Sequence, residues 1–245
     1  MKKNLILIPA ISAFGSFFSA AASYNVKYLA GGPSIPTSSL QGAYGATGES
    51  WNQATGSFNN LVDSAGNAST INISGLSGTL NFATDMSAAE RAATADTVFY
   101  GNSNLFGKGQ NQTITISGLA TGEIYDIYIY SLAHRSASWG LPTSTERSAG
   151  AFTTTNVSLN GTNQPLDNGN TGTNATTFTP GSNYVLFKSI VANGSGNISI
   201  IADALDGANP TRLHVNGLQI VSVPETSSAA ILGLSAFALV FRRRK

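Results

Sequence analysis

The sequence has no cysteine in 245 residues, only two histidines, and a charged fraction of 10%. The absence of cysteine excludes disulfides and a thiol nucleophile, so the core and its hydrogen bonds must stabilise the fold. The chain also lacks a His-Glu-x-x-His motif, a Gly-x-Ser-x-Gly elbow and a phosphate loop. These absences argue against an enzyme. A glycosidase with two carboxylates from distant strands stays open, because its acids need no fixed spacing in the sequence.

Both ends of the chain carry an apolar segment beside basic residues. Met1-Lys2-Lys3 precedes an apolar stretch and then small residues, as in a secretory signal peptide over residues 1–22. At the other end, the apolar run 229–241 precedes four cations, the pattern of a membrane stop. A helix over residues 227–241 would measure about 22 Å, short of a hydrocarbon core of about 30 Å. We expect an exported chain with an N-terminal signal helix and a short C-terminal hydrophobic helix that anchors it transiently in the membrane.

The C-terminal segment has three parts in a fixed order: Val223, Pro224 and Glu225, then the apolar run, then Arg242, Arg243, Arg244 and Lys245. Over residues 223–245 this order resembles the PEP-CTERM sorting signal of bacterial surface and matrix proteins, with Thr226 in place of the usual second proline. The resemblance implies cleavage near Pro224-Glu225 by exosortase, a membrane cysteine protease. It also implies a location in the cell envelope, at the cell surface or in the extracellular matrix. An ordinary membrane anchor or a buried helix is the alternative, although a buried helix has no use for four terminal cations.

Residues 23–222 are expected to form one domain with an acidic balance. Removal of the two terminal segments takes away six cations and one anion, which leaves seven basic and eleven acidic side chains, a net charge of −4. The net positive charge of the whole chain therefore belongs to its ends. Nucleic-acid binding has no electrostatic support and is not predicted.

Within this domain, polar residues alternate with Ile, Val, Leu, Phe and Tyr over short runs that turn residues separate. Many short strands without long helical patterns predict an all-β fold, an antiparallel β-sandwich of the jelly-roll kind. One short helix is expected over residues 87–95, where Ser87 and Glu90 have the spacing of a capping box. Residues 162–179 are expected to form a mobile loop. The predicted strands are residues 25–30, 70–74, 79–83, 97–100, 113–117, 124–132, 151–159, 183–191, 197–202 and 213–221.

An internal repeat supports the all-β prediction. Residues 70–76 recur as residues 113–119, each copy with alternating Ile and polar residues and a glycine that ends the strand. The second copy continues through Gly122 to Tyr125 and resembles the tyrosine corner of fibronectin type III domains, which implies that the Tyr125 hydroxyl bonds nearby backbone. Residues 50–67 and 216–220 resemble parts of the galactose-binding-like jelly rolls.

The strand 124–132 suggests a candidate binding surface. Its residues alternate between two faces, and if Tyr125 and Ile127 face the core, Tyr128 and Tyr130 point outward. The strand leads into a loop rich in imidazole, guanidinium and indole groups. Sugars bind to aromatic faces and planar polar groups. The predicted carbohydrate-binding residues are Tyr128, Tyr130, His134, Arg135 and Trp139. Two alternatives stay open: Trp139 plugs the end of the sandwich, or a loop covers the tyrosines.

No catalytic residue, cofactor or tightly bound metal is predicted. Residues 63–67 and 203–207 offer oxygens for a structural Ca²⁺ ion, but such sequences more commonly form Asx turns. His214 is expected to face solvent or to bond its neighbours. The sequence therefore predicts an exported, non-catalytic surface or matrix protein that associates with exopolysaccharide or carbohydrate. A polysaccharide-acting hydrolase or lyase and a purely structural or adhesive protein are the alternatives.

Overall fold

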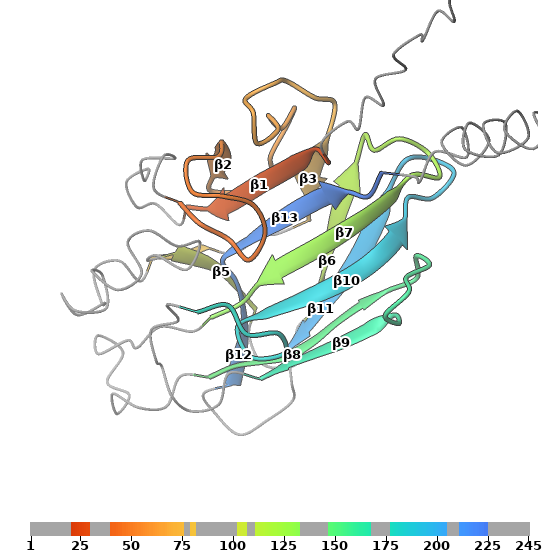
Figure 1. The fold of residues 1–245 in the computed structure, drawn as a ribbon. Coiled ribbons are helices and arrows are strands. Elements are labelled where there is room, and N and C mark those ends of the chain that lie inside the picture. The colour runs from red at the N-terminus through yellow and green to blue at the C-terminus, as the bar shows by residue number, and fades with distance from the viewer. Residues whose placement is uncertain are drawn as a thin grey trace, which may run out of the picture. The chain divides into compact units, whose positions relative to one another are not determined.

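The computed structural model describes residues 21–29, 40–75, 79–81, 102–106, 111–132, 147–167, 177–204 and 211–224. These residues form two β-sheets that lie one behind the other (Figure 1). Strand pairs are antiparallel except for β1 with β2 and β8 with β12. No helix occurs in the described part of the chain. The predicted all-β class is therefore confirmed, whereas the helix expected over residues 87–95 and the two terminal helices lie outside the described residues.

The first sheet has five strands in the order β10-β7-β13-β1-β2. The last strand of the chain, β13, lies between β7 and the first strand, β1, so that Ser23 pairs with Val221. The sheet is therefore complete only when the first and last strands of the domain have paired. The bounds of its strands are Tyr184–Val191 for β10, Ile124–Tyr130 for β7, Gly217–Ser222 for β13, Ser23–Tyr28 for β1 and Trp51–Ala54 for β2.

The second sheet has eight strands, with the order β3-β6-β11-β8-β12-β5-β4 and with β9 also paired to β8. Three strands pair with β8: β11 with residues 150–154, β9 with residues 149–153 and β12 with residues 147–148. The bounds are Asn72–Ser74 for β3, Thr79–Asn81 for β4, Asn102–Phe106 for β5, Asn111–Ser117 for β6, Arg147–Thr154 for β8, Asn163–Asp167 for β9, Ile198–Ala204 for β11 and Thr211–Val215 for β12.

The apolar core lies between the two sheets. Alternate residues of each strand contribute to it, as the pleat of a β-strand requires. Ile127 and Ile129 of β7 and Ile220 of β13 come from the first sheet, and Ile116 of β6 and Phe152 of β8 come from the second. All five side chains are fully buried. A buried side chain of this size stabilises the fold by about 1.5–3 kcal/mol, so the core compensates for the missing disulfides.

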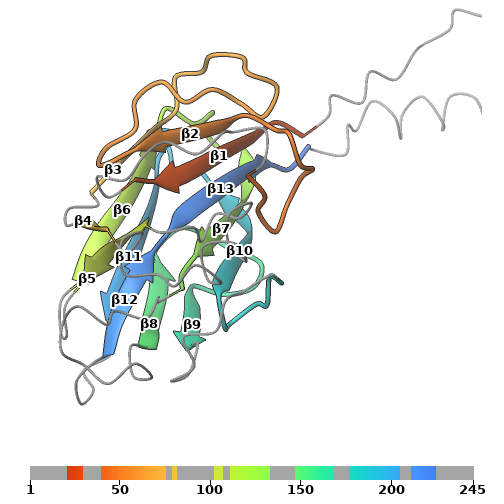
Figure 2. The same ribbon diagram turned by 90° about the vertical axis from the view of Figure 1, so that its left-hand side faces the viewer.

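One strand passes from one sheet to the other. β12 belongs to the second sheet, and after the single residue Asn216 the chain continues as β13 in the first, as Figure 2 shows. The backbone of Asn216 bonds to both neighbouring strands: its N–H donates to the Tyr130 carbonyl at 2.9 Å, and its carbonyl accepts from the Tyr28 N–H at 3.0 Å. Its side-chain oxygen accepts from the Leu132 N–H at 2.7 Å. Asn216 thus fixes the corner where the two sheets meet.

The two copies of the internal repeat pair with each other. β3 and β6 are antiparallel, and Ile73 lies opposite Ile116, the equivalent residue of the other copy. The copies are thus related by a local two-fold axis through this pair. Gly75 and Gly118, at equivalent positions, both have positive φ angles of 93° and 76°. A Cβ atom on either glycine would collide with a carbonyl oxygen of the other copy, which explains why both positions are glycine.

The structure corrects three predictions about local structure. Residues 162–179 are not entirely a loop, because residues 163–167 form β9 against β8. The long strand predicted over residues 213–221 is divided at Asn216 by the change of sheet. Of the two expectations for His214, the solvent-facing one is wrong: β12 is covered on both faces, and Leu213, His214 and Val215 are all buried. The backbone N–H of His214 donates to the hydroxyl of Ser148 at 3.1 Å.

Candidate functional site

The face of the first sheet that points away from the core carries aromatic and polar side chains in two rows. The register of the five strands fixes these rows, because partners on neighbouring strands point to the same side. The first row crosses the sheet as Trp51, Asn25, Gln219, Tyr128 and Leu186, and the second as Gln53, Lys27, Gly217, Tyr130 and Tyr184. We call this side of the sheet the outer face.

Tyr130 does not lie on an open platform. β7 turns Tyr125, Ile127 and Ile129 toward the core, which is the orientation in which Tyr128 and Tyr130 were expected to point outward. Tyr130 nevertheless has an exposed fraction of 0%. Its ring packs edge-on against Phe178 at a centroid distance of 5.6 Å and beside Tyr184 at 6.0 Å. The prediction of an exposed Tyr130 is therefore wrong, and the alternative of a covered tyrosine holds for this residue, because Phe178 and residues 40–50 lie against it.

Residues 40–50 cross the outer face and are held there by a network of buried amides. The Gln219 amide bonds Tyr44 of this segment twice, since Nε2 donates to its carbonyl at 3.0 Å and Oε1 accepts from its N–H at 3.1 Å. The same Oε1 accepts from the Tyr130 hydroxyl, and Nε2 also donates to Asn25 Oδ1 at 2.7 Å. The hydroxyl of Tyr130 in turn accepts from the Ala43 N–H at 2.7 Å. The Gln219 side chain thus forms with the Tyr44 backbone the pair of donated and accepted hydrogen bonds that a neighbouring strand would form.

A second set of bonds ties the end of this segment to β1. Asn25 Nδ2 donates to the Glu49 carboxylate and to the Ser50 carbonyl, both at 3.0 Å. Glu49 also accepts from the Ala46 N–H at 3.0 Å. The buried polar groups of the outer face are therefore bonded to one another, and removal of one partner would leave others without bonds in an environment that excludes water.

Three tyrosines lie together on the outer face. Tyr128 lies between Tyr44 and Tyr184, with centroid distances of 6.0 Å to each ring and interplanar angles of 40° and 31°. Tyr44 and Tyr128 are half-buried, and Tyr184 is largely buried. We call Tyr44, Tyr128 and Tyr184 the tyrosine surface. Burial, followed by the nearby Asp126 carboxylate, raises the pKa of Tyr128, so its hydroxyl is a neutral hydrogen-bond donor at physiological pH.

The tyrosine surface has one acidic and one basic residue beside it. Asp126 precedes Tyr128 by two residues on the same face of β7, and its Oδ1 accepts from the Ser189 N–H at 2.7 Å. Ser189 has a φ of 50° at a bulge in β10, and Asp126 therefore stabilises this irregular turn of the strand. Lys188 next to it is exposed. This part of the outer face therefore combines the aromatic ring of Tyr128 with polar groups from Asp126 and Lys188.

The loop residues His134, Arg135 and Trp139 lie outside the described residues, so their place in the predicted surface stays a prediction. The strands that hold the loop are described. The hydroxyls of Ser131, just after β7, and Ser148, near the start of β8, are hydrogen-bonded at 2.7 Å and fully buried. The Ser131 N–H donates to the Asn183 carbonyl at 2.9 Å. The loop therefore begins and ends on a rigid, buried base next to Tyr130.

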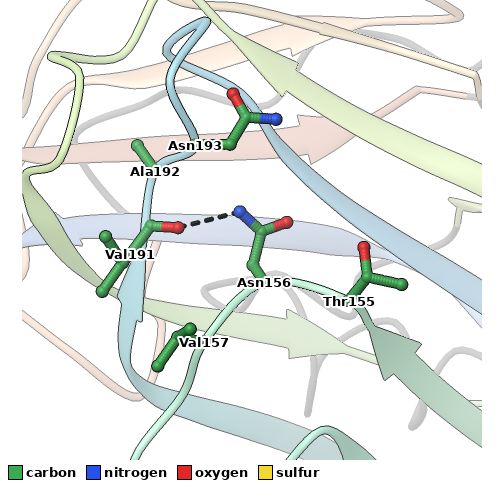
Figure 3. A pocket seen from close by; sticks show the side chains of 6 residues that line it. All are labelled: Thr155, Asn156, Val157, Val191, Ala192 and Asn193. Carbon is green, nitrogen blue, oxygen red and sulfur yellow. Dashed lines mark hydrogen bonds between the residues drawn. The ribbon is translucent and has the colours of Figure 1, made fainter.

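A shallow pocket of about 230 Å³ lies elsewhere, between the end of β8 and the β10–β11 turn (Figure 3). Asn156 is one of its polar residues, but its side chain already donates to the carbonyls of Val191 and Asn197 and accepts from the Ser199 N–H at 3.1 Å. The amide thus joins three segments and has no free group for a ligand. The remaining lining residues are Thr155, Val157, Val191, Ala192 and Asn193.

The two segments considered for Ca²⁺ differ in what the structure describes. In residues 63–67 the Asp63 carboxylate accepts from the N–H groups of Ala65 and Asn67 and from the Asn67 amide, an Asx turn. These bonds, the Asn67 side chain first, lower the pKa of Asp63. In the other segment only Asp203 and Ala204 are described, and Asp203 is exposed. Among the described residues no group of three or more acidic, His or Cys side chains is placed to hold a metal ion.

At the C-terminal end, Val223 and Pro224 are the described residues of the expected sorting segment. The Val223 N–H donates to the Ile124 carbonyl at 2.9 Å, and Pro224 is exposed. Glu225 and Arg242, Arg243 and Arg244 lie outside the described residues. In the part of the chain that the structure covers, no helix has the length and apolar character needed to cross a membrane.

Sequence reasoning missed Tyr44, Tyr184 and Gln219 as members of the outer face. Tyr44 lies in a glycine-rich segment without strand periodicity, and Gln219 stands in a strand whose outer face is expected to be wet. No pattern along the sequence connects these residues with β7, because the sheet register alone brings them together.

No family model matches the chain, and no curated protein matches it. Among solved structures, a crystal structure of the plant receptor-like kinase ANX2 is similar, at 18% sequence identity and a TM-score of 0.45. The similarity covers 83% of this chain and 48% of that one, so the chain spans about half of the length of this relative. This likeness assigns no function to the chain.

Proposed function

We propose that the protein is an exported, non-catalytic β-sandwich of the jelly-roll kind that associates with exopolysaccharide through the tyrosine surface. The observation that carries this proposal is the cluster of three rings, from Tyr44, Tyr128 and Tyr184, on the outer face. The backbone of Tyr44 is held there by its two hydrogen bonds to the Gln219 side chain. Rings fixed in this way lose little conformational freedom when a sugar stacks on them. The loop residues His134, Arg135 and Trp139 extend the same surface in this proposal.

Binding at such a surface is weak. A shallow platform buries little of its ligand, and a Kd near millimolar corresponds to about −4 kcal/mol. A matrix polymer offers many copies of its repeating unit, and many copies of the protein bind along it. Multivalent attachment of this kind raises the overall affinity by orders of magnitude without new contacts.

The test replaces Tyr44 or Tyr128 by alanine and measures retention by bacterial exopolysaccharides in affinity electrophoresis. An aromatic contact contributes about 1 kcal/mol, so each substitution is expected to weaken binding about fivefold. Tyr44→Ala is the sharper variant, because backbone bonds rather than its ring hold the segment on the sheet. Ile201→Ala, at a 39% exposed residue of the other sheet, is the matched control and should bind like the unchanged protein.

Three outcomes would count against this proposal. Release of oligosaccharides from the polymer by the purified protein would favour a hydrolase or lyase. Equal retention of the Tyr44, Tyr128 and Ile201 variants would remove the tyrosine surface as the binding site. No retention of any form by a panel of polysaccharides or glycans would favour a purely structural or adhesive protein.

We further propose that residues 223–245 act as a sorting signal and that an exosortase-type protease removes the membrane segment. The support is the order of Val223-Pro224-Glu225, an apolar run and a basic tail, together with the exposure of Pro224 just beyond β13. Mass spectrometry of the mature protein tests this. A chain that still ends in Arg244-Lys245 after export would refute processing, and a chain that ends near Pro224 would support it.

A further inference from the structure

Three large aliphatic side chains are exposed among the described residues, and two of them lie close together. Val157 is 71% exposed and Leu159 is 83% exposed, whereas Ile201 is 39% exposed and lies on the second sheet. Single exposed aliphatic residues are normal on a protein surface. Val157 and Leu159 are separated by one residue, and at such high exposure they form a small apolar patch, which we call the apolar point.

The segment that carries Val157 and Leu159 is held rigidly along the edge of β10. The Leu159 N–H donates to the Lys188 carbonyl at 2.9 Å, and the Ser158 hydroxyl donates to the same carbonyl at 2.8 Å. The Lys188 N–H donates to Asn160 Oδ1 at 2.9 Å. These bonds hold Ser158 and Asn160 against β10. The segment therefore has a fixed position, in which the side chains of Val157 and Leu159 point into solvent.

This apolar point lies at the end of the first sheet where the chain leaves the domain. Three backbone contacts in succession connect the two places: Val223 bonds Ile124, Ile124 pairs with Val191, and Val191 bonds the carbonyl of Val157. With neighbouring strands about 4.8 Å apart, Val157 lies about 14 Å from Val223. Figure 1 shows the β8–β9 connection and the end of β13 on the same side of the domain.

We propose that Val157 and Leu159, with the exposed Lys188 beside them, form a contact with the lipid bilayer while the C-terminal segment is in the membrane. This inference rests on the proposed membrane segment. Four residues, 225–228, separate Pro224 from the apolar run 229–241, and an extended chain of that length spans at most about 14 Å. The end of the domain that bears the apolar point is therefore held close to the bilayer surface.

The residue types fit an interfacial contact. Aliphatic side chains enter the boundary between headgroups and acyl chains, and a lysine beside them interacts with lipid phosphate and with anionic headgroups. The contact would orient the tyrosine surface, which lies on the outer face of the same sheet, relative to the membrane before cleavage. Once the anchor is removed, so few apolar side chains bind membrane only weakly, and the domain is free to leave.

The absence of cysteine makes a direct test possible. Single cysteines replace Val157, Leu159 or, as the control, Ile201 in the full chain, and each is labelled with a polarity-sensitive fluorophore. The protein is purified from bacterial membranes and reconstituted into vesicles of phosphatidylcholine and phosphatidylglycerol, with or without a lipid that carries a nitroxide at its headgroup. We expect the nitroxide to quench the labels at 157 and 159 at least twofold more than the label at 201.

The outcomes separate this inference from the proposed anchor. If the chain does not float with the vesicles in a density gradient, the membrane segment fails and the lipid contact fails with it. If the chain floats and the three labels are quenched equally, the anchor stands and the lipid contact is refuted. If labels at 157 and 159 shift to the blue without quenching as protein density rises, copies of the chain cover the apolar point, which also refutes the lipid contact.

Discussion

Lys27 gives the domain a pH-dependent stability that can be measured. It lies on the outer face of β1, opposite Gly217 and Gln53 on the neighbouring strands, and its side chain is fully buried. Burial disfavours the charged amine and lowers its pKa from 10.5 to about 7. The outer face carries further titratable groups besides Lys27, among them Tyr130 and Glu49. Burial raises the pKa of Tyr130, so its hydroxyl does not titrate below pH 10.

The sign of the effect follows from proton binding. Between pH 7 and 10.5 the unfolded chain keeps a proton on this amine and the folded chain does not, so the free energy of unfolding rises with pH. The slope is about 1.4 kcal/mol per pH unit, and the whole shift corresponds to about 5 kcal/mol. Below pH 7 both states are protonated, and the full destabilisation by the buried cation is present. From pH 7 to pH 9 about 2 kcal/mol of it should be relieved, because the folded amine is still half protonated at pH 7.

Urea unfolding of the unchanged protein and of the Lys27→Met variant at pH 6, 7, 8 and 9 measures this. Methionine fills a similar volume without an amine, so the variant should be more stable at pH 6, and its advantage should shrink by about 1.4 kcal/mol per unit above pH 7. Lys188→Met, at an exposed lysine, is the matched control. A Lys27→Met protein that is less stable at every pH would show that Lys27 is charged and well bonded in the folded state, which would refute the reasoning.

Two further predictions concern local strain and buried hydroxyls, and urea unfolding at neutral pH measures both. Gly118→Ala should lower the free energy of unfolding by about 3 kcal/mol, because its Cβ would collide with a carbonyl oxygen. Gly161→Ala is the control, at a φ of 91° in open space, and should lower it by only about 1 kcal/mol. Equal losses would argue against the collision. Tyr125→Phe should cost about 1 kcal/mol, since the hydroxyl accepts from a backbone N–H at 3.2 Å. Tyr28→Phe should cost nothing or stabilise, because that buried hydroxyl bonds no group among the described residues, and a loss as large as that of Tyr125→Phe would contradict this.

Strand periodicity predicted the parts of the fold that depend on local alternation. In β7 the alternation correctly grouped Tyr125, Ile127 and Ile129 on one face, and this face lies in the core, because one face of a half-buried strand must be apolar. The tyrosine corner was also predictable, and its hydrogen bond from Ala120 is present. The glycines that end the two repeat copies have the positive φ angles that such a turn needs.

The outer face was not predictable in the same way, because it depends on what covers a strand rather than on the strand itself. Tyr128 and Tyr130 have the same alternation and the same chemistry, yet one is half-buried and the other is fully buried. The difference comes from Gln219 and residues 40–50, which are distant in sequence. β2 and β9 were also missed: residues 51–54 and 163–167 are short, mostly polar edge segments whose pairing is imposed by their neighbours.

The position of β13 connects the fold with the proposed sorting of the chain. Because β13 lies between β1 and β7, the first sheet is incomplete until residues 217–222 have pairing partners on both sides. These residues end one position before Val223, and Ser222 bonds the carbonyl of Ala22 at 2.9 Å through its N–H. Pairings between the first and last strands form late, since the whole chain must close into a loop. Under the proposed export, a domain built in this way completes its fold only after nearly all of it has crossed the membrane, when the proposed anchor holds its C-terminus there.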